Sequence, residues 1–85
     1  MPILSRFFGI TIAMVYQDHQ PPHFHARYGA YEALVEIDSG QVEGQMPGRA
    51  LQMVLEWRTL HMAALQANWQ CCLRHEALQP IPPLE

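Results

Sequence analysis

Lysine is absent from this 85-residue sequence, and charged residues of any kind are few. All five basic residues are arginines, the net charge is −3, and charged residues make up 15% of the chain, against about 25% in a typical globular protein. A protein that holds nucleic acid by neutralising many phosphates carries a basic surface or stripe. The composition therefore argues against broad, non-specific DNA binding, and leaves single arginines able to hold one or two phosphates.

Cysteine is nearly absent as well, because the chain has only Cys71 and its neighbour Cys72. Adjacent cysteines rarely bond to each other, since the ring would be strained. The chain therefore has neither a disulfide framework nor a paired-cysteine zinc motif. No apolar run approaches the ~18 residues of a membrane span, and Met1 to Leu4 is too short for a signal peptide. We expect a cytoplasmic protein that does not enter a membrane.

The first half of the chain shows the patterns of β-strands. Residues 7–16 are apolar on both faces, which predicts a central strand. Residues 23–28 and 31–37 alternate with a period of two and predict two more strands, and 41–45 predicts a short fourth one. Because the turns between these segments are short, the strands must be antiparallel.

The second half predicts one long helix over residues 49–74. Its polar positions form a stripe roughly 100° wide, and the rest of its circumference is apolar. A single small sheet cannot cover that much apolar surface, so we expect Met53, Leu60 and Ala64 to pack against a second copy of the chain. The predicted fold is α+β, with a three- to four-stranded antiparallel sheet followed by one long C-terminal helix packed on it. We place a single domain at residues 1–78 and an extended, proline-rich tail at 79–85.

Three of the five histidines fall within the seven residues HQPPHFH. His23 and His25 are two apart on a predicted strand, so their rings lie on the same face and can converge on one metal ion. Asp18 and His19 precede the strand on a loop stiffened by two prolines, and either can return as a further ligand. Imidazole with carboxylate suits Zn, Fe, Mn or Ni, so we expect one transition metal ion here.

A metal-free reading of the same residues stays open. His19, His23 and His25 are then candidate catalytic groups for proton transfer. Arg27 would clamp an anion, and Asp18 or Glu32 would orient an imidazole. Such a set suits cleavage of RNA. A third reading is that these are ordinary surface histidines.

Two polar residues interrupt the apolar arc of the predicted helix. Arg58 lies opposite the polar stripe, and a buried guanidinium there predicts a carboxylate partner. The candidate partners are Glu32, Glu36 and Asp18. His61 is more typical of a core histidine than of a ligand, because the aromatic faces of strands 23–28 and 31–37 are better suited to take the helix. Asn68 is expected to bridge by hydrogen bonds and Trp69 to anchor the core.

Several segments together resemble one family. They are SRFFGI, DHQPPHFHARY, GRALQMVLEW, the LH and NW pairs on the helix, and PIPPLE. The chain resembles the short bacterial family known as domain of unknown function 4160. The family's recurrent polar residues fall on Arg6, Asp18, His19, His23, His25, Tyr28, Arg49, His61 and Asn68. The resemblance assigns no role to these residues, and we group Arg6, Arg49 and His61 as further polar site candidates.

The resemblance also bears on partners. Members of the family are often encoded beside another small protein, in pairs that resemble toxin–antitoxin modules. We therefore expect an interaction module that works with a small partner protein from a neighbouring gene, with a histidine-rich site that binds a metal or an anion. The alternative is a small histidine-dependent ribonuclease or phosphodiester hydrolase. A DNA-binding regulator fits less well, because one long helix supplies no helix-turn-helix.

Overall fold

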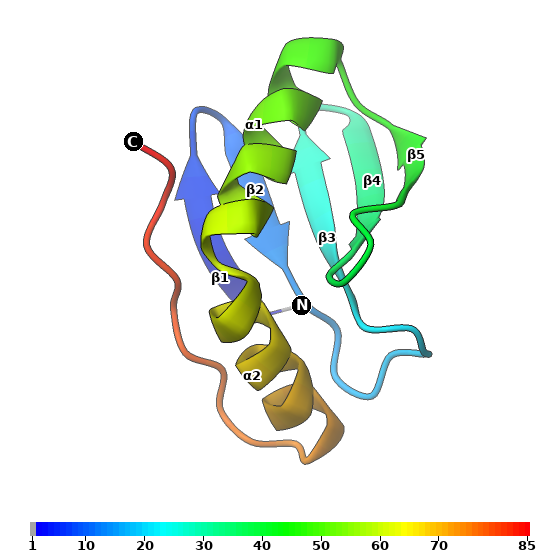
Figure 1. The fold of residues 1–85 in the computed structure, drawn as a ribbon, viewed down its shortest axis with the longest axis vertical. Coiled ribbons are helices and arrows are strands. Elements are labelled where there is room, and N and C mark those ends of the chain that lie inside the picture. Colours follow the sequence, from blue (N-terminus) through cyan, green and yellow to red (C-terminus); the bar gives the residue numbers. More distant parts are fainter. Residues whose placement is uncertain (1) are drawn as a thin grey trace.

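The computed structural model describes residues 2–85 and has an α+β fold (Figure 1). Five antiparallel strands form one sheet in the order β1-β2-β3-β4-β5, so every strand pairs with its neighbours in sequence. The strands are β1 (Ile3–Phe7), β2 (Ile10–Ala13), β3 (His23–Tyr28), β4 (Tyr31–Glu36) and β5 (Val42–Gln45), and they are followed by helices α1 (Gly48–Leu60) and α2 (Met62–Leu73). The predicted α+β class is confirmed, but the predictions of three or four strands and of one helix are wrong.

A hairpin turn divides the segment predicted as one strand over residues 7–16. Phe8 and Gly9 have φ angles of 48° and 80°, and Phe7 pairs with Ile10 across them. Two central residues with positive φ make the tight turn that suits the twist of antiparallel strands. The usual signal for this turn is Asn-Gly or Asp-Gly, and Phe-Gly lacks it. The side chain of Phe8 is 60% exposed, so it is removed from the apolar strand face it was expected to join.

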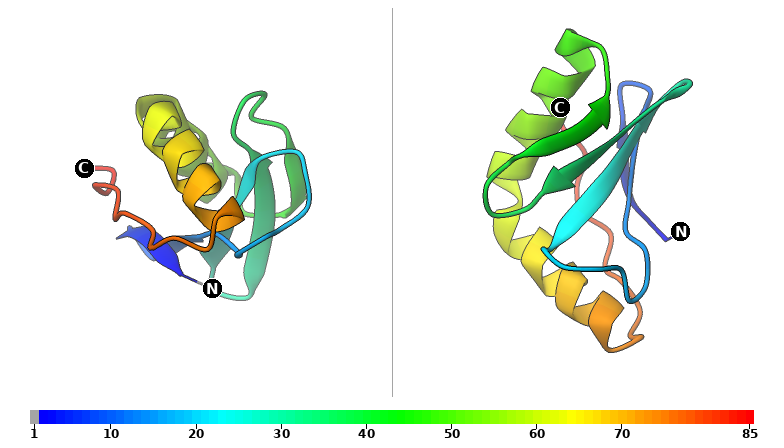
Figure 2. Two further views of the ribbon diagram at one scale, coloured as in Figure 1. Left: turned by 90° about the horizontal axis from the view of Figure 1, so that it is seen from below. Right: turned by 90° about the vertical axis from the view of Figure 1, so that its right-hand side faces the viewer.

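Both helices lie on one face of the sheet, which curls around them (Figure 2). Phe24, Ala26 and Val35 are fully buried on that face. The ring of Phe24 meets the edge of the Trp57 ring from α1 at a centroid distance of 5.8 Å. The prediction that the aromatic faces of these strands take the helix is therefore confirmed. No helix of residues 2–85 has the length and the apolar character needed to cross a membrane.

The helical segment breaks at His61, whose φ and ψ are −127° and 27°. Its N–H bonds to the carbonyl of Arg58, three residues earlier, while its own carbonyl accepts from Leu65. Neither glycine nor proline marks this point, so the sequence gives no signal for it. The ring of His61 packs at 5.4 Å from that of Trp57.

The guanidinium of Arg58 binds backbone carbonyls, so the predicted carboxylate partner is wrong. Its Nε donates to the carbonyl of Ile37 and its Nη2 to that of Asp38, both at 2.7 Å. A carbonyl carries only a partial charge, but two of them at the β4–β5 turn match the fork of donors. Arg58 thereby ties α1 to this turn.

The segment predicted as a proline-rich tail is extended and packs along the helices and β1 (Figure 1). Ile81 is buried and its N–H donates to the carbonyl of Leu4 at 2.9 Å. The indole of Trp57 donates to the carbonyl of Pro82 at 2.9 Å. The side chain of Asn68 both accepts from and donates to the backbone of Gln79, which confirms the expected hydrogen-bond bridge.

Part of the apolar helix surface that we expected to meet a second chain packs against the core of the same chain. Leu78 and Leu84 pack against the same core, as do Met53 and Ala64. Leu60 remains 64% exposed. The homodimer through the helix stays a prediction, with a smaller free surface than the sequence indicated.

Candidate metal centre

The loop between β2 and β3 carries Asp18 back over the start of β3. Contacts with the end of α2 hold its first part: the N–H of Gln17 donates to the carbonyl of Cys72 at 3.3 Å. The ring of Tyr16 also stacks on that of His75, with centroids 5.8 Å apart and planes 14° from parallel. At the other end of the loop, the carbonyl of Pro22 accepts from the N–H of Ile37. The loop is therefore attached to the fold on both sides of Asp18.

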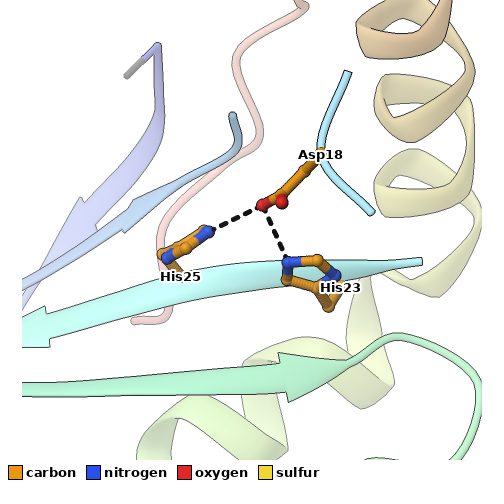
Figure 3. A group of neighbouring side chains, drawn as sticks. All are labelled: Asp18, His23 and His25. Atoms are coloured by element: carbon orange, nitrogen blue, oxygen red, sulfur yellow. Dashed lines mark hydrogen bonds and ion pairs between the residues drawn. The ribbon is translucent and has the colours of Figure 1, made fainter. Parts of the chain in front are cut away.

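Asp18, His23 and His25 converge on one point (Figure 3). The Oδ2 atom of Asp18 lies 2.9 Å from Nε2 of His23 and 3.2 Å from Nε2 of His25. The three residues offer ligand atoms that all lie within 4.8 Å of one another, so the cluster is geometrically suited to hold a metal ion. The prediction that the two imidazoles share one side of a strand is confirmed.

The other nitrogen of each ring has a partner of its own. Nδ1 of His23 lies 2.8 Å from the carbonyl oxygen of Pro21, and Nδ1 of His25 lies 3.3 Å from Oε2 of Glu32. A carbonyl and a carboxylate accept hydrogen bonds, so each Nδ1 atom is the donor. This pattern fixes the ring orientations and directs both Nε2 atoms toward Asp18.

The arrangement favours a positive charge between the three side chains. A neutral imidazole that donates through Nδ1 presents a lone pair at Nε2. Two such lone pairs facing a carboxylate oxygen would repel it. Either a proton on each Nε2 or one metal cation between the three atoms removes this repulsion.

Asp18 is a carboxylate over the ordinary pH range. Burial by itself would raise its pKa, but hydrogen bonds from His25, from the backbone N–H of His19 and from His23 lower the pKa to about 2. The hydrogen bond from His25 likewise lowers the pKa of Glu32, with a further contribution from the charge of Arg27. Both acids therefore supply negative charge to the two sides of His25.

The centre has one closed side and one accessible side. His23 is 5% exposed and its ring packs on that of Trp69, with centroids 5.3 Å apart. The side chains of His25 and Asp18 are 13% and 16% exposed. Solvent therefore reaches the cluster, while packing holds its side chains in place.

His19, predicted as a further ligand, lies beside the centre. Its side chain is 76% exposed, and its Nδ1 atom faces Oδ1 of Asp18 at 2.9 Å, not the Oδ2 atom that the other two rings share. The structure therefore brings together three of the four predicted ligands, and His19 borders them.

The remaining site candidates divide between the two faces of the sheet. The Nε atom of Arg27 donates to Oε1 of Glu32 at 3.1 Å, next to His25. Arg6 lies on β1 and Arg49 on α1, while His61 lies between the helices. Arg49 and His61 belong to the helical layer and take no part in the centre.

Sequence reasoning missed two supports of the centre. The first is the carbonyl of Pro21, which orients His23, and the second is Trp69, which closes the site behind it. Trp69 was predicted only as a core anchor. No spacing rule could link it to His23, because the contact depends on where α2 crosses the end of the sheet.

A small pocket of about 50 Å³ lies next to His23 on the β4–β5 side of the sheet. It is lined by His19, Pro21, His23, Leu34, Glu36, Gln41 and Glu43. Its two acids make this side of the centre negative.

Comparison with known proteins identifies the family. The sequence model of a family described as a domain of unknown function (DUF4160) matches residues 9–70, which include Asp18, His23, His25 and Glu32. No curated protein and no solved structure matches the chain. Since the match spans most of its length, the chain belongs to the DUF4160 family.

Proposed function

We propose that this protein binds one divalent transition metal ion through Oδ2 of Asp18 and the Nε2 atoms of His23 and His25. The observation that carries the proposal is the division of roles between the ring nitrogens. Both Nε2 atoms converge on one carboxylate oxygen, while both Nδ1 atoms bond to separate acceptors. Histidines that ligate metals almost always use their second nitrogen in this way.

The distances support the same conclusion. Ligands held at about 2.0–2.1 Å from one ion lie roughly 2.9–3.4 Å from each other in octahedral or tetrahedral geometry. The observed separations of 2.9 and 3.2 Å from Asp18 to the two imidazoles match this range. Two imidazoles and a carboxylate suit Zn, Fe, Mn or Ni.

The ligand set also supports a role beyond structure. Structural zinc sites use four protein ligands, whereas sites that act on a substrate usually use three and leave a position for water. Asp18, His23 and His25 are three, and the cluster is accessible on one side. A metal-dependent phosphodiester hydrolase is therefore the second candidate function, in which an ion held by these three residues would activate water for attack on the ester.

A partner protein remains part of the proposal. The exposed side chains of Leu60 and Phe8 give the chain apolar surface that a small protein from a neighbouring gene would cover. In this reading the cytoplasmic protein is a metal-binding interaction module. This proposal places the centre beside that interface, so the metal-free chain should bind the partner less tightly.

Elemental analysis of protein purified without a histidine tag and without chelators tests the metal site. We expect one equivalent of metal in the wild type and in the control His61→Ala, which removes a histidine outside the centre. The double variant His23→Ala with His25→Ala should hold none. A double variant that keeps its metal, or a wild type that takes up none of the four metals when each is supplied, would refute the proposal.

A further inference from the structure

We infer that the open face of the sheet binds the phosphate group of a small phosphate monoester, held by Arg6 and Arg27 beside the metal centre. This inference rests on the proposed metal site and names the ligand that the site would take. It is carried by the strand register, by a hollow in the open face and by the distribution of charge around it.

The strand register places the two arginines on opposite sides of one threonine. Arg6 pairs with Thr11, and Thr11 pairs with Arg27. Directly paired residues of neighbouring strands point to the same face. With strands about 4.8 Å apart, the two arginine backbones are roughly 10 Å apart, and both side chains can reach over Thr11.

A hollow of about 270 Å³ lies at this position and is lined by Ile3, Thr11, Ala13 and Arg27. Ala13 and Thr11 are small, so the floor of the hollow is low. Ala13 pairs directly with His25, which makes the hollow the immediate neighbour of the metal ligand. Both helices lie on the other face of the sheet (Figure 2).

The charges of the open face are segregated by strand. Arg6 and Arg27 lie on β1 and β3, whereas Glu32, Glu36 and Glu43 lie on β4 and β5. Among residues 2–85 no ion pair holds Arg6. An anion is therefore attracted to the β1–β3 side and repelled by the β4–β5 side.

Glu32 does not block Arg27 from a ligand. Their ion pair spans 3.1 Å, but the two side chains are 55% and 45% exposed. Exposed pairs of this kind add little to stability, so Arg27 can exchange Glu32 for a ligand. Glu32 would keep its hydrogen bond to His25 and so continue to orient that ligand.

The number of cationic and hydrogen-bonding groups around the hollow favours phosphate over carboxylate. A metal ion next to His25 and the guanidinium groups of Arg27 and Arg6 present three separate cationic partners, and Thr11 adds a hydroxyl. A carboxylate has two oxygens, whereas a phosphate monoester has three unsubstituted oxygens and a charge near −2 at neutral pH. Ile3, which is 45% exposed, offers apolar surface to the organic part of the ligand.

Calorimetric titration with phenyl phosphate tests the inference, on zinc-loaded and on metal-free protein. Loss of one charge-assisted contact should weaken binding about tenfold, so we expect that effect in Arg27→Gln and in Arg6→Gln. The matched control Arg49→Gln removes an exposed arginine from α1 and should bind like the wild type. Metal content and circular dichroism of each variant establish that the centre and the fold are intact.

The outcomes separate this inference from the metal proposal. Equal affinity of all four proteins overturns the arginine site, even where each still holds zinc. Affinity for benzoate equal to that for phenyl phosphate overturns the assignment to phosphate, and tighter binding of a dinucleoside monophosphate overturns the assignment to a monoester. Arginine-dependent binding to protein that takes up no zinc would support the anion site while refuting the metal site.

Discussion

The two faces of the sheet differ in composition although the same strands build both. In β3, Phe24 and Ala26 are fully buried under α1, while His23, His25 and Arg27 point the other way. In β4, Val35 is buried and Glu32 is half exposed. Because side chains alternate along a strand, one set of residues supplies stability and the other supplies chemistry. A register slip of one residue would exchange the two sets, so the core also fixes the geometry of the site.

Removing Trp57, one of two buried tryptophans, should have the greatest effect on stability. Trp57 is fully buried, contacts the rings of Phe7 and Phe24 and donates to the carbonyl of Pro82. We expect Trp57→Ala to lower the free energy of unfolding by about 3–5 kcal/mol. Urea unfolding followed by circular dichroism measures the change. A loss below about 1 kcal/mol would mean that the helix-covered face does not form the core, since such a value is usual for exposed positions.

Metal binding should make the open face contribute to stability as well. At a free metal concentration a hundred times the dissociation constant, an ion that binds only the folded state adds about 2.7 kcal/mol. We expect the thermal midpoint to rise when metal is added and to fall when a chelator is added. Asp18→Ala should show neither shift, because it removes the ligand that both imidazoles face. An unchanged response to metal in this variant would assign the stabilisation to another site.

Acid should destabilise the metal-free protein through Asp18. The folded-state pKa is about 2 and the ordinary value is 3.8. The carboxylate therefore stabilises the fold above pH 3.8, and this contribution is lost as the pH falls from 3.8 to about 2. Since the side chain is partly solvated, we expect a loss of roughly 1–2 kcal/mol.

Comparison with Asp18→Asn isolates this contribution from those of other acids. Urea midpoints measured between pH 2 and pH 5 in a chelator should converge for the two proteins at the acidic end. Parallel curves over the whole range would show that Asp18 has the same proton affinity in the folded and unfolded chains.

The smallest effect on stability is expected at the arginines of the open face. Arg6 is exposed, and substitutions at such positions usually change stability by less than about 0.5 kcal/mol. Arg6→Gln should therefore unfold like the wild type while it weakens anion binding. A large loss of stability would mean that Arg6 supports the fold, and the contrast between the two faces would not hold on β1.

The sequence predicted the elements whose signals are local. The alternation at residues 23–28 and 31–37 predicted β3 and β4 within one residue, and the same alternation placed His23 and His25 on one side of the sheet. The proline-containing loop was expected to return toward them, and Asp18 does so.

The remaining features depend on contacts between distant segments. Phe8 adopts a positive φ that phenylalanine rarely takes, so the first hairpin was missed. Arg58 reaches carbonyls that only the packed β4–β5 turn presents. The helix breaks at His61, where the sequence has neither glycine nor proline. These features could not be predicted, because they depend on how the helices pack against the sheet and its turns.

The attachment of the Asp18 loop to the end of α2 has a thermodynamic consequence. Tyr16 and Gln17 hold that loop through His75 and Cys72, and Asp18 follows immediately in the chain. Any cation that draws Asp18 toward β3 must then also favour the docked position of the helix terminus. Such coupling is reciprocal. The factor by which the cation favours docking of the α2 terminus is also the factor by which loss of docking lowers the affinity for the cation.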